Sequence, residues 1–383
     1  MLLTGTRVLE WAEGLSAPFA SRLLGDLGAE VLKIEAPGGD PLRQRAPFWP
    51  GESGADASAL FGYVNAGKAS EVVDTGSAAG RARLEALLDQ ADILIESQPP
   101  EVVDVAALQA RHPRLTVLSL TPFGRSGPLS GAPATDFTLQ HRAGFAWAMA
   151  RPVDDPQARG PLGGADHEGP LAVGVTGALA AMWGLLVAQA GGPPPAIDLA
   201  SHDFYAHIAF EGLADWLTGE RRFSRVRVKK EGTEAAGGLT WILPCRTGWI
   251  MVSPREQHQW DRWTALLGDP AWARDVELCS TRVHRRRNFF ELQTLMAEWT
   301  RQFAPEDVAA RTQAVQVACF PVSTPGELLA NAQLLHRGLF DRLVSPGGQS
   351  VPVPGLPFKA VTTGHGPLER ERTRRGPSLG GAP

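Results

Sequence analysis

The sequence predicts an α/β protein built on a Rossmann-like parallel sheet, and two observations carry this prediction. The chain opens with an apolar run at Thr6–Glu10, a helical stretch and a second apolar run at Glu30–Glu35, which is the pattern of a β-α-β unit. Strand-like and helix-like stretches then alternate up to about Leu199, as in doubly wound sheets. Ligands of such sheets bind beyond the carboxyl ends of the strands, here Trp11–Phe19 and Glu35–Arg43.

Local sequence places the next elements of this first region. Pro18 fits the first turn of a helix, where a missing N–H is tolerated. The apolar stretches Ile93–Glu96 and Leu115–Leu120 predict strands, and the stretches Ala82–Gln90 and Val105–Arg111 predict helices between and around them.

The stretch Pro170–Ala190 contains no charged residue and is long enough for a transmembrane helix. Its many Gly and Ala residues, and the lack of an aromatic or basic belt at either end, favour a core helix packed closely against the sheet. A turn at Gly191–Pro195 and a strand at Ala196–Leu199 follow. We therefore expect no membrane partner.

The pattern changes beyond this strand. A helix is expected from Ser201 to about Arg221, a hairpin over Leu239–Ser253, and helices over Gln257–Leu267 and Phe289–Phe303. These elements predict a smaller α+β domain. We divide the chain into a large α/β domain over 1–200, a linker helix over 201–224, a small α+β domain over 225–325 and a C-terminal segment over 326–383.

Composition excludes several classes of function. The chain has 383 residues, 43% of them hydrophobic, and a formal net charge of -4, so it lacks the basic footprint of a nucleic-acid-binding protein. Its three cysteines, Cys245, Cys279 and Cys319, form no CxxC pair, which argues against a disulfide framework and against a zinc site. The N-terminus has no basic segment followed by a long apolar run. We expect a cytoplasmic protein without a metal.

Four segments carry a resemblance. They are TRVLEWAEGLSAPFASRLLGDLGAEVLKIEAPGGDPLR (Thr6–Arg43), NAGKASEVVD (Asn65–Asp74), ADILIESQPP (Ala91–Pro100) and LSLTPFGRSGP (Leu118–Pro128). In order and spacing they resemble the class III CoA-transferase family, the CaiB/BaiF group. The resemblance implies acyl-CoA and carboxylic acid substrates, and a C-terminal segment that returns to the large domain and its sheet. It also implies an interlocked dimer, formed with a second copy or with a related subunit.

The resemblance implies transfer of CoA between two acids. This reaction needs an ionised aspartate at a helix start, where amide N–H groups stabilise the carboxylate and the oxyanion that forms. In PQARGPLGGAD (Pro156–Asp166), Asp166 falls at this place when positions are counted forward from Gly144. Counting backward from Gly184 and Asp198 reaches Val173 or Gly174 instead, and neither can act as a nucleophile. Two alternatives stay open: either residues are inserted after Asp166, or the chain is a non-catalytic subunit that pairs with an active homologue.

Asp166 also has a purely structural interpretation, as the N-cap of the following helix or as a solvated turn residue in a Gly-rich loop. The adjacent His167 and Glu168 are the residues that an acyl-CoA racemase of this fold would use as an acid/base pair to exchange the α proton.

For coenzyme A itself, the resemblance implies six residues at turns that border the nucleotide: Ala17, Pro18, Asp40, Arg43, Lys68 and Ser97. Arg43 and Lys68 are the candidate phosphate ligands. The structural alternative is that Asp40 and Arg43 bridge each other at the surface. The chain departs from the family pattern at Ala36, where the family usually has Arg, and at Ser97-Gln98, where it has Asn-Phe.

A dinucleotide-binding oxidoreductase is a further alternative. Glu35 ends the second expected strand, about twenty residues after the first turn, where such proteins place a ribose-binding acid. The segment Gly14–Ala20, however, lacks the glycine fingerprint, and Pro18 removes an amide that the pyrophosphate would need.

Overall fold

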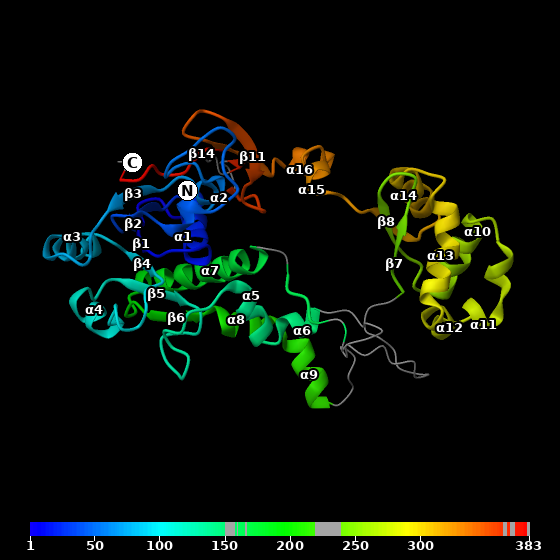
Figure 1. The fold of residues 1–383 in the computed structure, drawn as a ribbon, viewed down its shortest axis with the longest axis horizontal. Coiled ribbons are helices and arrows are strands. Elements are labelled where there is room, and N and C mark those ends of the chain that lie inside the picture. Colours follow the sequence, from blue (N-terminus) through cyan, green and yellow to red (C-terminus); the bar gives the residue numbers. More distant parts are fainter. Residues whose placement is uncertain are drawn as a thin grey trace. The chain divides into compact units, whose positions relative to one another are not determined.

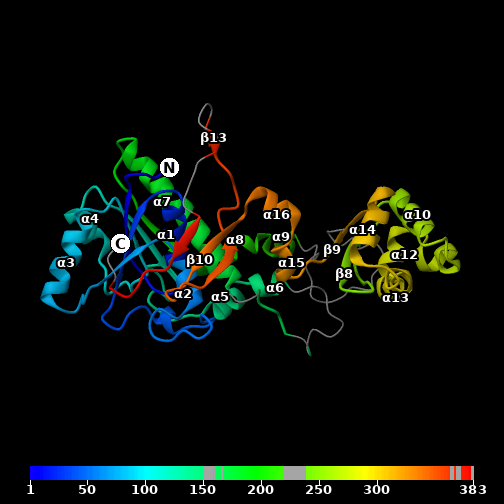
Figure 2. The ribbon, with the colours of Figure 1, turned by 90° about the horizontal axis from the view of Figure 1, so that it is seen from above.

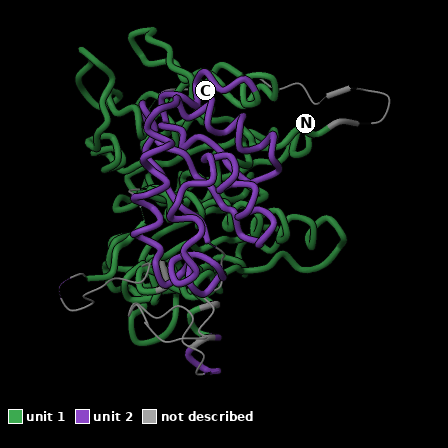
Figure 3. The backbone as a smooth tube through the Cα atoms, turned by 90° about the vertical axis from the view of Figure 1, so that its right-hand side faces the viewer, with its two compact units in different colours: residues 1–150, 160–213, 333–383 green, residues 151–159, 214–332 purple. Residues whose placement is uncertain are grey.

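The structure is a computed structural model, and the residues that it describes are 1–149, 158, 160–164, 167–218, 239–362, 366–367 and 372–380. The chain forms two compact units, shown in separate colours in Figure 3. The first unit comprises residues 1–150, 160–213 and 333–383, and the second comprises 151–159 and 214–332. The C-terminal segment thus belongs to the same unit as the N-terminus.

The first unit is built on a six-stranded parallel sheet with the strand order β3-β2-β1-β4-β5-β6 (Figure 1). This is the order of a Rossmann sheet, so the predicted fold class is confirmed. The strands are β1 (Arg7–Trp11), β2 (Glu30–Glu35), β3 (Ala69–Val72), β4 (Ile93–Glu96), β5 (Thr116–Thr121) and β6 (Ala196–Ala200).

The expectation that the C-terminal segment joins this sheet is wrong. Strand β10 (Phe340–Val344) instead forms a second sheet with β11 (Ser350–Pro354) on one side and β14 (Thr373–Arg375) on the other. A tight hairpin satisfies the backbone of β10 locally, and Leu343 packs with Trp49. A further two-stranded sheet joins β12 (Val361–Thr362) and β13 (Gly366–Pro367).

Helices cover both faces of the parallel sheet because successive strand residues point to opposite sides. Ile93 and Ile95 of β4 lie in the core formed with α1 (Ser16–Asp26) and α7 (Glu168–Gln189). Leu94, between them, lies in the core that includes α3 (Ala78–Leu88) and α4 (Val105–Arg111). The other helical elements of this unit are η1 (Pro41–Gln44), α2 (Ala59–Val64), α5 (Asp136–Arg142), α6 (Phe145–Met149), α8 (Ser201–Ile208) and α16 (Ala332–Arg337), several of which are visible from above in Figure 2.

Helix α7 is the apolar helix that the sequence predicts over 170–190, and it starts two residues earlier. Its 22 residues are long and apolar enough to cross a membrane. Glycines on one face allow close packing, since a Cβ on Gly174 would lie 2.7 Å from the carbonyl oxygen of Ser16 in α1. The opposite face exposes apolar side chains, so the helix is buried on one side only: the exposed ones are Val175, Leu179, Trp183 and Leu186.

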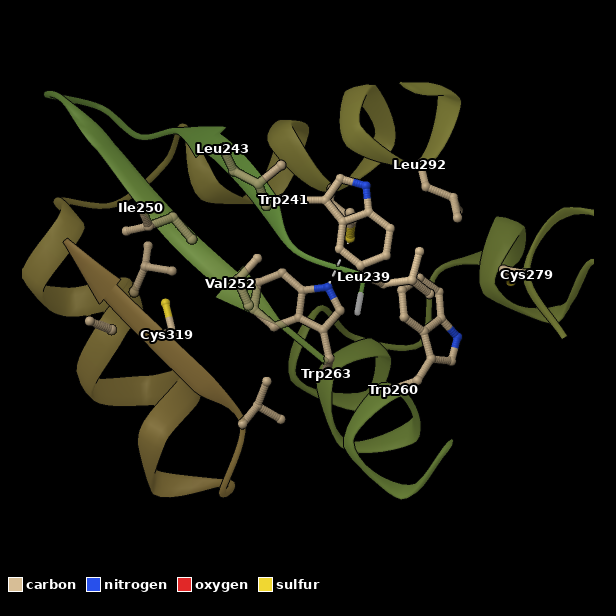
Figure 4. Packing of buried hydrophobic residues seen from close by; sticks show 14 of the residues in the cluster. Leu239, Trp241, Leu243, Ile250, Val252, Trp260, Trp263, Cys279, Leu292 and Cys319 are labelled. Carbon is tan, nitrogen blue, oxygen red and sulfur yellow. Dashed lines mark hydrogen bonds between the residues drawn. The ribbon is translucent and has the colours of Figure 1, made fainter. Parts of the chain in front are cut away.

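The single helix expected from Ser201 to about Arg221 is two helices in the described residues, α8 and α9 (Phe210–Thr218). The predicted hairpin is confirmed: β7 (Trp241–Pro244) and β8 (Trp249–Ser253) pair antiparallel, and β9 (Ala318–Pro321) adds to β8. Trp241, Trp260 and Trp263 lie in the core between this sheet and its helices (Figure 4). These helical elements are α10 (Gln257–Leu266), η2 (Ala271–Arg274), α11 (Val276–Cys279), α12 (Arg282–Arg287), α13 (Phe289–Thr300), α14 (Pro305–Ala314) and α15 (Pro325–Leu328).

Candidate functional site

The strand order places the topological switch point between β1 and β4, where ligands of open α/β sheets bind. A pocket of ≈ 110 Å³ lies at the carboxyl ends of β1 to β4. Its lining comes from the turns that follow these strands: Trp11, Ala12, Glu13, Lys33, Ile34, Glu35, Ala36, Asp40, Val73, Thr75 and Gln98. The position of the pocket agrees with the binding edge expected from the sequence.

A cluster of buried charges supports the floor of this pocket. Glu10 of β1 and Lys33 of β2 face each other in the strand register, and Lys33 Nζ lies 2.7 Å from Glu10 Oε1. Lys33 Nζ also lies 2.8 Å from Asp40 Oδ2, and Lys68 Nζ lies 2.6 Å from Glu10 Oε2. We call Glu10, Lys33, Asp40 and Lys68 the buried ion cluster; it ties β1, β2 and the turn after β2 to the turn before β3.

The surroundings of the cluster set its charge. Burial alone raises the pKa of Glu10, but the charges of Lys33 and Lys68 outweigh burial and lower the pKa to about 2. Burial likewise disfavours charged Lys33, yet Glu10 and Asp40 outweigh it and raise its pKa. For Lys68 burial is the larger effect, and the pKa falls to about 8 despite the neighbouring Glu10.

Lys68 directs its ammonium inward. Besides Glu10, it donates to the carbonyl oxygen of Pro18 at 2.8 Å and to Asn65 Oδ1 at 2.7 Å. An ammonium has three donors, so these contacts use all of them. Lys68 therefore joins the first turn of α1 to the end of α2, and a phosphate would have to displace one of these partners.

Arg43 is also engaged within the chain. Its guanidinium makes a two-pronged contact with Glu35, both bonds 2.7 Å long, and reaches Asp56 Oδ1 at 2.6 Å. The interpretation that Asp40 and Arg43 bridge each other at the surface is wrong, because both are buried and each has another partner. Glu35 accepts from Ser70 and from the Asp40 amide as well, so its carboxylate is not presented to a ribose as a dinucleotide site requires.

The other residues implied at the nucleotide, Ala17, Pro18 and Ser97, follow the carboxyl ends of β1 and β4 and do not line the pocket. Ala17 and Pro18 are buried in the first turn of α1, as the sequence predicts for Pro18. Ser97 Oγ accepts from the Glu13 amide at 3.0 Å, which links the ends of β1 and β4 across the switch point. Of the six implied residues, Asp40 lines the pocket, and so do Ala36 and Gln98, two positions where the chain departs from the family pattern.

The pocket lining is acidic. It contains the carboxylates of Glu13, Glu35 and Asp40, and the ammonium of Lys33 in the lining is held by Glu10 and Asp40. Arg43 holds Glu35 and Lys33 holds Asp40, so Glu13 is the carboxylate in this lining that is left to accept from a ligand, and the lining offers no unpaired cation from its own side chains. It suits hydroxyl and amino groups of a ligand better than phosphate.

A second candidate region surrounds the start of α7. Asp166 lies outside the described residues, which include Gly160–Gly164 before it and His167 after it. His167 has a φ of 78° and occupies the N-cap position of α7, and Glu168 is the first helical residue. The N-cap interpretation of Asp166 is therefore wrong, because His167 holds that position.

Sequence reasoning missed three polar residues beside this region. Asp136 and Gln140 of α5 meet Tyr205 of α8, where the Tyr205 hydroxyl donates to Asp136. Burial and the Asp136 carboxylate both raise the pKa of Tyr205. The only signal was a pair of polar residues four apart in a helix, which is too common to indicate a site.

Comparisons with known proteins identify relatives along the whole chain. The profile of CoA-transferase family III matches residues 3–381. The chain is 30% identical to subunit BbsE of succinyl-CoA:(R)-benzylsuccinate CoA-transferase from Thauera aromatica, over 96% of this chain and 89% of that one. It is 27% identical to a succinate–glutarate CoA-transferase from Agrobacterium fabrum, over 99% and 93%. The crystal structure of a CaiB/BaiF family protein from Brucella suis superposes with a TM-score of 0.81 at 25% identity, covering 99% and 96% of the two chains.

Proposed function

The chain belongs to CoA-transferase family III, and from this premise we propose that it moves CoA from a short dicarboxylic acyl-CoA, with succinyl-CoA as the donor, to a second carboxylic acid. The observation that carries the proposal is the family match over residues 3–381. The donor is taken from the relative from Thauera aromatica, whose name specifies succinyl-CoA. The relative from Agrobacterium fabrum is named for succinate as well.

In the proposed mechanism Asp166 is the nucleophile. Its carboxylate attacks the thioester carbonyl of the donor, CoA leaves as the thiolate, and a mixed anhydride forms. The thiolate then attacks the Asp166 carbonyl, which releases the donor acid and leaves an enzyme–CoA thioester. The acceptor carboxylate attacks this thioester to form a second anhydride, and the thiolate returns to the acceptor acyl carbon. Asp166 is regenerated, so no proton or electron is consumed.

The pocket at the carboxyl ends of β1 to β4 is the proposed site for the nucleoside part of CoA. The Glu13 carboxylate in its lining suits a ribose hydroxyl or the adenine amino group. The buried ion cluster and the Glu35–Arg43 pair hold the turns in place rather than bind phosphate themselves. Ala17, Pro18 and Ser97 contribute backbone and packing around the same edge.

Two alternatives make different predictions. A racemase would use His167 and Glu168, which are adjacent in sequence, on the N-cap and in the first turn of α7. A non-catalytic subunit would retain the fold and need an active homologue. The second alternative has a parallel in the relative from Thauera aromatica, which is itself named as a subunit.

The proposed oligomeric state and cellular compartment of the protein are those that the sequence analysis led us to expect. We propose a dimer with a second copy or a related subunit. The three cysteines are free and buried, which is compatible with the reducing cytoplasm where we place the protein. The site as proposed needs no metal.

The test is transfer from succinyl-CoA to a panel of acids, namely glutarate, malate and benzylsuccinate, with new CoA esters detected by mass spectrometry. We expect at least one ester from the wild type and none from Asp166→Ala. Hydroxylamine added with succinyl-CoA should label Asp166 in the wild type. Asp203→Ala, which changes an exposed aspartate on α8, is the matched control and should keep full activity.

Full activity in Asp166→Ala would contradict the nucleophile. Activity that appears only after co-expression with a homologous subunit would favour the non-catalytic alternative. Exchange of the α proton of a branched acyl-CoA without transfer would favour the racemase.

A further inference from the structure

A polar network lies beside the stretch of chain that carries Asp166. Gln140 Nε2 donates to Asp136 Oδ2 at 2.6 Å, and the Tyr205 hydroxyl donates to the other oxygen of the same carboxylate. Gln140 is 2% exposed and Tyr205 is 1% exposed. The ring of Phe145 in α6 packs against Tyr205, with 5.5 Å between the ring centres. The network therefore joins α5 to α8 in a buried position.

The same network contacts the chain on both sides of Asp166. The Gly164 amide donates to Gln140 Oε1 at 2.7 Å, two residues before Asp166. Three residues after Asp166, a Cβ on Gly169 would lie 1.7 Å from the Tyr205 hydroxyl oxygen, so the helix backbone lies directly against this side chain. The network thus contacts the described chain at Gly164, before Asp166, and at Gly169, after it.

The side-chain amide of Gln140 both accepts and donates a hydrogen bond. Its carbonyl oxygen accepts from the Gly164 amide while its NH₂ group donates to Asp136. An ionised carboxylate in the same place could accept but could not donate. A buried donor or acceptor left without a partner is costly, so this position demands an amide or a protonated acid.

We propose that Asp136, Gln140 and Tyr205 are positioning residues that hold the described chain on either side of Asp166, residues 160–164 and 167–169, in the geometry that CoA transfer requires. This proposal rests on the proposed function of Asp166. The network touches the backbone around the nucleophile and needs no contact with substrate. Its effect falls on the rate of the chemical steps, because a misplacement of about 1 Å costs roughly 100-fold in rate.

The decisive variant is Gln140→Glu, which changes one atom type and keeps the shape. When protonated, the introduced acid accepts from Gly164 and donates to Asp136 as Gln140 does; when ionised, it repels Asp136. Burial and the adjacent carboxylate raise the pKa of an acid in this place. Tyr205 of α8 is the ionisable group within the network besides Asp136. In the described part of the chain, His141 of α5 and Glu168 of α7 are the ionisable groups beside the network.

With succinyl-CoA as the probe, we expect kcat of Gln140→Glu to approach the wild-type value near about pH 5 and to fall roughly 100-fold below it by about pH 8, with KM unchanged. The matched control is Gln109→Glu in α4. Gln109 donates to the Pro194 carbonyl at 3.1 Å, away from the network, and this variant should keep the wild-type pH profile.

A second measurement does not depend on activity. Hydrogen exchange of amides 160–169 should be about 10-fold faster in Tyr205→Phe than in the wild type, with Tm lowered by no more than about 2–4 °C, because one hydrogen bond to Asp136 is lost. Faster exchange combined with an unshifted Gln140→Glu profile overturns the positioning role, as does unchanged exchange. A wild type that transfers nothing from succinyl-CoA contradicts the proposed function instead, and the exchange result then decides separately whether the network braces the segment.

Discussion

At the scale of single residues, the unusual feature of this chain is charge placed inside a parallel sheet. Glu10 and Lys33 are fully buried at paired positions of adjacent strands, where such sheets normally carry apolar side chains. Removing one partner of a buried ion pair leaves an uncompensated charge and typically costs about 3–5 kcal/mol. The cluster also holds the turn after β2 through Asp40 and the turn after β1 through the Ala12 carbonyl, which accepts from Lys33, so its loss would also release turns that line the pocket.

The acid stability of the protein should depend on Glu10. The pKa of Glu10 is lowered to about 2 in the folded chain from an ordinary value of 4.5. A lowered pKa means that the unfolded chain binds the proton more readily, so the contribution of Glu10 to stability is complete above pH 4.5 and is lost as the pH falls toward 2.

Urea unfolding between pH 7 and about pH 2.5 checks this expectation. The wild type should lose stability more steeply than Glu10→Gln over the acidic part of this range. Glu30→Gln, which changes an exposed glutamate of β2, is the control and should follow the wild-type slope. Equal slopes for the wild type and Glu10→Gln would rule out the assigned role.

At the scale of elements, α7 shows why glycine is used inside a helix. Glycine lowers helix propensity by roughly 1 kcal/mol relative to alanine. In return, the missing side chains allow close packing: α7 approaches α1 at Gly174 and Gly177, and it approaches β5 and β6 at Gly184. The buried face is thus shaped for close packing, while the exposed face keeps larger apolar side chains.

The substitution Gly174→Ala should destabilise the protein by about 1–3 kcal/mol although it improves helix propensity. Its Cβ would meet the Ser16 carbonyl oxygen at 2.7 Å, and backbone cannot move aside as a side chain can. Chemical unfolding measures the change. In Gly177→Ala the nearest atom is the Leu120 Cδ1 at 3.1 Å, so we expect a smaller loss.

Gly326→Ala in α15 provides the control for propensity alone, since no atom lies within 4 Å of its added Cβ. It should be neutral or stabilising by up to about 1 kcal/mol. A Gly174→Ala variant as stable as this control would mean that α7 and α1 are not in close contact in solution.

At the scale of the whole molecule, we expect the chain to associate. The exposed apolar row on α7, formed by Val175, Leu179, Trp183 and Leu186, is the surface that we expect this association to cover. Sedimentation of the purified chain should give twice the mass of one chain. Leu179→Glu should weaken the dimer without unfolding the chain, while Val276→Glu, at an exposed apolar position of the second unit, serves as the control.

A stable monomer at micromolar concentration would contradict the homodimer. A chain that is soluble only together with a related subunit would point to the heteromer instead.

Most of the large domain could be predicted because its signals are local. The runs at 30–35 and 93–96 are strands with the predicted bounds, since short apolar runs between turn residues have few other stable conformations. Less of the site could be predicted. The resemblance implied Arg43 and Lys68 as candidate phosphate ligands, and the structure pairs each of them with a buried carboxylate.

The fold class, the family and the carboxyl edge of the sheet where the candidate pocket lies could all be predicted from the sequence, because the spacing of apolar residues, the turn residues and the order of the motifs are local properties of the chain. The folded structure was needed to show which charges pair, that the C-terminal strands form their own sheet, and that Asp136, Gln140 and Tyr205 meet beside Gly164. The reason is distance along the chain. Glu10 and Lys68 are 58 residues apart, and Asp136 and Tyr205 are 69 apart, so their contacts exist only after the sheet has brought α1, α5, α7 and α8 together.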